Sequence, residues 1–201
     1  MKKIIMFSFI AMGFIACKKS NDSPSSDQAL SGNWRFVSMT AHSTATDESN
    51  FSGISLMTVS VSDYTTENNG GTVSFSGGKM IGTGITYSVN TNVVVTDYEN
   101  GVEQDTFTEP FSWTIDPANS TSTYKVVSTD SLFFPSGGFV SSASLSNGTN
   151  QQTVASGCRF HISNDSLTMV SSYSKDTIVN INGFNTSLIE TINYSTLLKK
   201  Q

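Results

Sequence analysis

The feature that most restricts the fold of this sequence is a series of short runs in which apolar and polar residues alternate. In the clearest run, residues 107–115, every second position is apolar or aromatic except Glu109. Successive side chains of a strand point to opposite faces of a sheet, so this pattern predicts a strand with one buried face. No helical periodicity of useful length appears after residue 16, although residues 30–32 could make one short turn of helix. The chain is therefore predicted to be all-β.

About ten candidate strands follow one another with turn-forming residues between them. Asn100-Gly101 stands between two strand-like runs, the strongest short hairpin signal, and residues 163–165 separate a second pair. Short turns join antiparallel neighbours, so an antiparallel meander is expected. We expect the last strand, 186–198, to pair with the first and close the sheet as a barrel. A β-sandwich is the alternative.

Several local expectations follow from the same alternation. The first strand is expected to place Trp34 and Phe36 on one face and Met39 on the other. Polar residues with Asn and Gly at 67–71 and 90–92 predict turns. His42, in a polar stretch, is expected in an exposed loop.

The N-terminus has the composition of a secretory signal. Two lysines precede a mostly apolar run that ends at Ala16, and this run is too short to span a bilayer. Residues 14–17, Phe-Ile-Ala-Cys, resemble the lipobox of bacterial lipoproteins. That resemblance implies cleavage before Cys17 and its modification with a diacylglyceryl group and an N-acyl chain such as palmitate. We expect a signal peptide at 1–16, a lipidated cysteine and flexible tether at 17–30, and one domain at 31–201.

The likeness to bacterial lipoproteins also implies a location. The protein is expected to be anchored in the cell envelope, at the outer membrane, because Lys18 stands where an Asp often marks inner-membrane retention. Its expected partner is the membrane, through the N-terminal lipid.

Charge and cysteine content exclude several classes of protein. The net charge is −5, only 13% of residues are charged, and no basic stripe is present, which argues against a nucleic-acid partner. Lipidation of Cys17 leaves Cys158 alone, so no internal disulfide is expected. Cys158 alternates with Phe160 and Ile162, which predicts that it packs as a small apolar residue.

The start of the domain resembles that of the lipocalins. Residues 30–34, Leu-Ser-Gly-Asn-Trp, match the Gly-x-Trp that opens the barrel of that family, and residues 96–98 match its Thr-Asp-Tyr. The family places an Arg over the Trp near the last strand, whereas this chain has Lys199 and Lys200 there. The resemblance implies an eight-stranded barrel whose interior holds a small apolar molecule.

Four residues are candidates for ligand binding: Trp34, Glu109, Trp113 and Glu190. Glu109 and Glu190 interrupt otherwise apolar faces, so each points into the interior unless a bulge or the rim places it in water. The two tryptophans either contact a ligand or pack in the core.

No enzymatic activity, cofactor or metal is predicted. The chain has no Gly-x-Ser-x-Gly, phosphate loop or dinucleotide fingerprint, and two histidines without clustered thiols do not suggest zinc. The preferred hypothesis is an envelope lipoprotein that binds a small hydrophobic or amphipathic ligand inside a barrel. The alternative is a structural or adhesive domain that recognises a protein or glycan through the loops 135–138 and 146–152.

Metabolic labelling tests the anchor. In a bacterial host that processes lipoproteins, labelled fatty acid is expected on the protein and absent from the Cys17→Ser variant, because the thiol carries the lipid. The matched variant Cys158→Ser should keep the label. Native protein without label would exclude the anchor.

Overall fold

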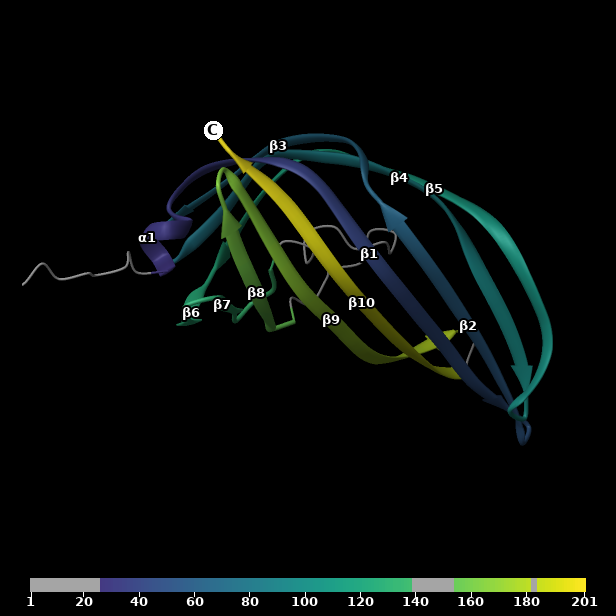
Figure 1. Cartoon of the computed structure of the whole chain (residues 1–201). Coiled ribbons are helices and arrows are strands. Elements are labelled where there is room, and N and C mark those ends of the chain that lie inside the picture. The colour runs from purple at the N-terminus through teal and green to yellow at the C-terminus, as the bar shows by residue number, and fades with distance from the viewer. Residues whose placement is uncertain (1–25, 139–153, 182–183) are drawn as a thin grey trace, which may run out of the picture.

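The computed structural model describes residues 26–138, 154–181 and 184–201. These residues form one short helix and a single ten-stranded sheet in which every pairing is antiparallel (Figure 1), so the all-β prediction is confirmed. The elements are α1 Ser26–Leu30, β1 Gly32–Phe51, β2 Ile54–Thr65, β3 Glu67–Ser76, β4 Lys79–Glu99, β5 Val102–Thr123, β6 Lys125–Ser128, β7 Ser131–Phe134, β8 Ser156–Ser163, β9 Ser166–Ile181 and β10 Phe184–Lys200. No helix in the described ranges is both long and apolar enough to cross a membrane.

The strand pairings close the sheet on itself. β2 and β3, separated by Thr66 alone, each pair with both β1 and β4 and so act as one interrupted strand. β5 pairs with β4, and β6 continues β5 after Tyr124 and pairs with β7. The order then runs through β8, β9 and β10 back to β1. The predicted antiparallel meander that closes as a barrel is confirmed, with the last strand beside the first.

The closed sheet has two different ends. At the end that carries α1, every strand except β2 contributes, and we call it the closed end. Beyond it, β5, β4, β2, β1, β10 and β9 run on as a curved sheet towards the β1–β2 and β4–β5 hairpins (Figure 1). We call this part, residues 41–65, 88–112, 172–181 and 184–193, the distal sheet. β5 and β9 are its edges, because within the described residues β8 pairs with β9 only up to Ser171.

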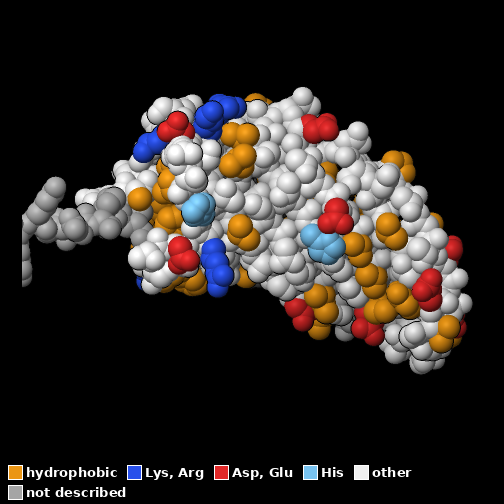
Figure 2. Space-filling model, in the orientation of Figure 1, with side chains coloured by type: hydrophobic (Ala, Val, Ile, Leu, Met, Phe, Trp, Pro, Cys, Tyr) orange, Lys and Arg blue, Asp and Glu red, His pale blue; other side chains and the backbone are white. Residues whose placement is uncertain are grey.

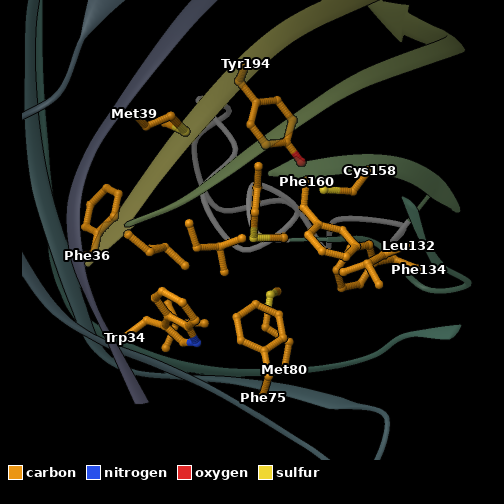
Figure 3. Close-up of a cluster of buried hydrophobic side chains, with 14 of the residues drawn as sticks. Trp34, Phe36, Met39, Phe75, Met80, Leu132, Phe134, Cys158, Phe160 and Tyr194 are labelled. Carbon is orange, nitrogen blue, oxygen red and sulfur yellow. The ribbon is translucent and has the colours of Figure 1, made fainter. Parts of the chain in front are cut away.

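Side chains fill the interior of the closed end. Trp34 and Phe36 of β1 meet residues from the opposite wall, among them Phe134 and Phe160, and Figure 3 shows these side chains pointing towards one another. Trp34 is 0% exposed, and its indole N–H donates to the Leu30 carbonyl oxygen at 2.8 Å. Burying large aromatic side chains is the main favourable contribution to folding here.

Lys200 covers this aromatic core from the end of β10. Its ammonium nitrogen lies 5.4 Å from the centre of the Trp34 ring, and Trp34 and Lys200 are directly paired across β1 and β10. A cation over an indole face is attracted by the electron density of the ring. One of the two C-terminal lysines therefore occupies the position over the tryptophan.

Met39 lies on the opposite face of β1 from the predicted one, because β1 contains a β-bulge. The register of β1 against β10 shifts between Phe36 and Ser38, which adds one residue to β1 and reverses the alternation after it. Met39 consequently lies on the same face as Trp34 and is 1% exposed. The expectation that it faces away from Trp34 was wrong because a bulge has no clear signature in the sequence.

Two segments that were predicted to form turns belong to strands instead. Residues 67–71 belong to β3, where Asn68 and Gly71 have positive φ values of 51° and 93° and mark register shifts against β4. Residues 90–92 lie within β4, which continues for 21 residues. Asn and Gly provide the local backbone conformation of a bulge as readily as that of a turn. The hairpin at Asn100-Gly101 is confirmed, with φ of 50° and 77°.

The folded part of the chain begins before the predicted tether ends. Helix α1 covers Ser26–Leu30, inside the range 17–30 expected to be flexible. Leu30 is 0% exposed, and the Tyr124 hydroxyl donates to the Asp27 carboxylate at 2.6 Å. These contacts fix the entry of the chain to the closed end.

Truncation of the two tryptophans should distinguish the fully buried centre of the core from its partly buried margin. Trp34→Ala is expected to lower the free energy of unfolding by about 3–5 kcal/mol, because it empties a fully buried site. Trp113→Ala should cost less, since Trp113 is only partly buried. Urea denaturation followed by circular dichroism measures both values. Equal losses would contradict a core centred on Trp34.

Candidate functional site

A cavity on the inner face of the distal sheet is the candidate site. Its floor consists of four small side chains from two neighbouring strands, β1 and β2. Ser43 is paired directly with Ser62, and Ala45 with Ser60. Small side chains on adjacent paired positions leave space above the sheet that larger residues would fill.

Larger side chains form the walls of this cavity. Tyr64 of β2, Val93 of β4, Phe111 of β5 and Glu190 of β10 line the cavity around the four small residues, and the volume of this half-open cavity is about 170 Å³. The walls are therefore mostly apolar, with one carboxylate and one phenol. Such a mixture of apolar surface and a few polar groups is typical of small-molecule sites.

Of the residues that the structure describes, Glu190 supplies the one charged group that lines the cavity. Burial raises the pKa of its carboxyl above the usual value, and the ammonium group of Lys175, directly paired with it across β9 and β10, opposes this shift. Among the described residues, the carboxylate makes no hydrogen bond and no ion pair within 4 Å. A half-buried carboxylate without a direct partner is able to accept hydrogen bonds from a ligand.

Two tyrosines lie within the electrostatic influence of Glu190. Burial, and to a smaller extent the charge of Glu190, raise the pKa values of Tyr64 and Tyr173. Both phenols therefore stay protonated at neutral pH and are able to donate a hydrogen bond. Tyr64 lines the cavity, whereas Tyr173 faces Ile192 one strand away.

The four predicted site residues occupy different places. Glu190 lines the cavity as expected for an inward carboxylate. Glu109 shares the face of Phe111 on β5 but is exposed, on an edge strand. Trp113 packs edge-to-face on Tyr87 at 5.9 Å, outside the lining. Trp34 is buried in the closed end and does not line the cavity.

Sequence reasoning missed most of the site. The four small floor residues and Tyr64 are spaced two apart along β1 and β2, but small polar residues at that spacing carry no signal for a cavity. Their meaning depends on the register between β1 and β2, which the sequence does not reveal. Lys175, which stands opposite Glu190 across β9 and β10, carries no such signal either.

Two further candidate binding sites, on the outer surface of the sheet, are more open than the inner-face cavity. Two open grooves of about 500 and 560 Å³ cross the outer face of the sheet and share Val170 and Asn193. One contains His42, whose ring lies 2.8 Å from the Asp63 carboxylate. His42 is exposed on β1, so the expected loop position was wrong.

The loops of the adhesive hypothesis are only partly described. In residues 135–138, Gly137 and Gly138 are buried, while 146–152 lies outside the described residues.

Cys158 is 3% exposed, and burial raises the pKa of its thiol, so the prediction that it packs in the core is confirmed. In the described ranges, no group of three His, Cys, Asp or Glu side chains is placed to hold a metal.

The comparisons with known proteins found no similar protein. No protein-family model, no curated protein and no solved structure matches this chain. The fold and the site thus define a class only: a closed antiparallel β-sheet with a small, mostly apolar cavity beside a half-buried carboxylate.

The pH dependence of stability tests the environment of Glu190. Because its pKa is raised in the folded state, ionisation of Glu190 removes stability as the pH rises through the usual Glu pKa, about 4.3, and up to the raised value. Glu190→Gln should therefore melt at a higher temperature than the native protein at about pH 7. Below about pH 4 both side chains are uncharged and the difference should vanish.

A matched variant provides the control for this measurement. Glu109→Gln removes the same charge from the exposed edge strand β5 and should leave the melting temperature nearly unchanged at both pH values. If Glu190→Gln behaved like Glu109→Gln, the half-buried position of Glu190 would be wrong.

Proposed function

We propose that this protein is a non-enzymatic, lipid-anchored component of the bacterial cell envelope that binds a small amphipathic molecule in the inner-face cavity. The observation that carries the proposal is the cavity of about 170 Å³ beside the half-buried Glu190. The apolar part of the ligand would lie against Val93 and Phe111, on the β4 and β5 side of the small floor residues. Its polar end would meet Glu190 and Tyr64.

The size of the cavity limits the apolar part to a single ring or a short chain. A protein cavity of about 150 Å³ lined by apolar side chains accommodates benzene. The inner-face cavity is of comparable volume and opens onto the concave face of the distal sheet. A longer ligand would extend along that face.

The charge of the inner face favours a ligand with a basic group. Asp47 and Asp97 flank Thr58 in one row across β1, β2 and β4, and Asp105 is paired with Asp97 on β5. Lys175 is the one Lys or Arg among the described residues of the distal sheet. An amine would satisfy the Glu190 carboxylate in a charge-assisted hydrogen bond, whereas a carboxylate ligand would be repelled.

Two further observations support the proposal. The cation over the buried tryptophan at the closed end is the arrangement that the lipocalin resemblance implies, with Lys200 in place of Arg. The lipobox-like residues before Cys17 support an anchor in the envelope, at the outer membrane. Neither observation requires catalysis, and the cavity has one carboxylate instead of a paired acid and base.

Calorimetry with two matched compounds tests the binding site. An aromatic amine, benzylamine, is expected to bind, and benzoate, of the same size and opposite charge, is not. Ala45→Leu should abolish binding by filling the cavity. Glu190→Gln should weaken binding by about 10- to 100-fold, the usual worth of a hydrogen bond to a charged group.

The control for these variants is Thr44→Val, which changes the neighbouring position on the outer face of β1. It should bind benzylamine like the native protein. Equal binding of amine and carboxylate, or undiminished binding by Ala45→Leu, would overturn the proposed site.

A further inference from the structure

Charge is distributed very unevenly over the molecule. Six of the seven described Lys and Arg residues lie at the closed end: Arg35, Lys79, Lys125, Arg159, Lys199 and Lys200. Ten of the fifteen described acidic residues lie in the distal sheet and five at the closed end, so the formal charge of the distal sheet is −9 and that of the closed end is +1. On the face shown in Figure 2, the basic side chains gather near α1 and the acidic ones extend towards the opposite end.

Two of the cations at the closed end are placed side by side. Arg35 of β1 and Lys199 of β10 are directly paired across the two strands. Their other cross-strand neighbours, Thr72 and Ser166, are uncharged. Neither cation forms an ion pair within the described part of the chain. Directly opposed like charges destabilise a sheet, so this pair is more easily explained by an external anionic surface than by folding.

The chain enters the domain at the same end. Helix α1 is fixed there by the bond from Tyr124 to Asp27 and by the bond from the Trp34 indole to Leu30. Nine residue steps separate Cys17 from Ser26. Nine such steps span at most about 32 Å even when fully extended. A lipid on Cys17 would therefore keep the closed end near the bilayer.

We propose that the closed end docks on an anionic phospholipid surface through its six Lys and Arg residues, which we call the closed-end cluster. The distal sheet with its cavity then points away from the membrane. The inference rests on the lipid anchor proposed above. The anchor supplies proximity, and the two charged ends supply orientation. Attraction of the basic end and repulsion of the acidic sheet act in the same direction.

The strength of docking on the anionic surface depends on the number of cations at the closed end. Each Lys or Arg near an anionic membrane surface increases binding about fivefold. Loss of two such residues should lower the ratio of docked to undocked domain about 30-fold. The attraction falls off over a Debye length, about 8 Å at physiological salt, so it should weaken strongly as salt is added.

Energy transfer on reconstituted vesicles tests the orientation. The processed, lipidated full-length protein is inserted into phosphatidylcholine vesicles with or without phosphatidylglycerol, and an acceptor dye labels the lipid head groups. A donor dye is attached either at Ser76→Cys, next to the closed end, or at Asn50→Cys, near the distal hairpin. Both positions are exposed, whereas the native Cys158 is buried.

With phosphatidylglycerol, transfer from position 76 should be high and transfer from position 50 low. In neutral vesicles or at high salt, the two values should approach each other. The variant Arg35→Gln/Lys199→Gln should behave in anionic vesicles as the native protein does in neutral ones.

A second double variant controls for total charge. Thr44→Glu/Asn193→Glu changes the net charge by the same amount on the outer face of the same two strands, but in the distal sheet and away from the closed end. It should keep the orientation of the native protein. If both double variants lost it equally, net charge and not the closed-end cluster would be responsible, which would overturn the inference.

Flotation of the vesicles distinguishes absence of the lipid anchor from absence of docking by the closed end. Protein that fails to float with neutral vesicles has no lipid anchor, which would overturn the anchor and this inference together. Protein that floats but shows equal transfer from both positions in anionic vesicles would overturn the docking inference alone.

Discussion

The structure depends on the long antiparallel pairing of β1 with β10, which joins the two ends of the chain and removes the free edges from one end of the sheet. The register runs from Trp34–Lys200 to Ser49–Thr186 with a single shift. This register places Lys200 over Trp34 and Glu190 beside Ala45. One pairing therefore positions both the covered aromatic core and the polar end of the candidate site.

The two parts of the sheet are stabilised differently. The closed end is held by buried aromatic and aliphatic side chains, whereas the distal sheet is held mainly by its backbone ladders and has half-exposed faces. Its edge strand β5 is protected against further pairing by Glu109, Pro110 and neighbouring charges, because proline cannot donate to a ladder and charges disfavour association. A rigid core thus supports an extended concave surface on which a ligand can lie.

The cavity, the acidic inner face and the basic closed end are arranged along one molecular axis. If the closed end docks on an anionic bilayer, the cavity opens on the side away from the lipid. The ligand would then come from the aqueous compartment and not from the membrane beneath. Binding and orientation would use charges of opposite sign at opposite ends, so neither would interfere with the other.

The sequence by itself determined the strand content, the hairpins at Asn100-Gly101 and 163–165, and the shared face of Trp34 and Phe36, because local alternation and turn residues carry this information. It left open whether Glu190 points inward. Only the tertiary structure decided the length of the strands, the face of Met39, the exposure of Glu109 and the existence of the cavity. Polar stretches such as 67–71 and 90–92 are strand because neighbouring strands satisfy their backbone groups. Bulges and register between distant strands set which side chains meet, and neither is encoded in any single segment.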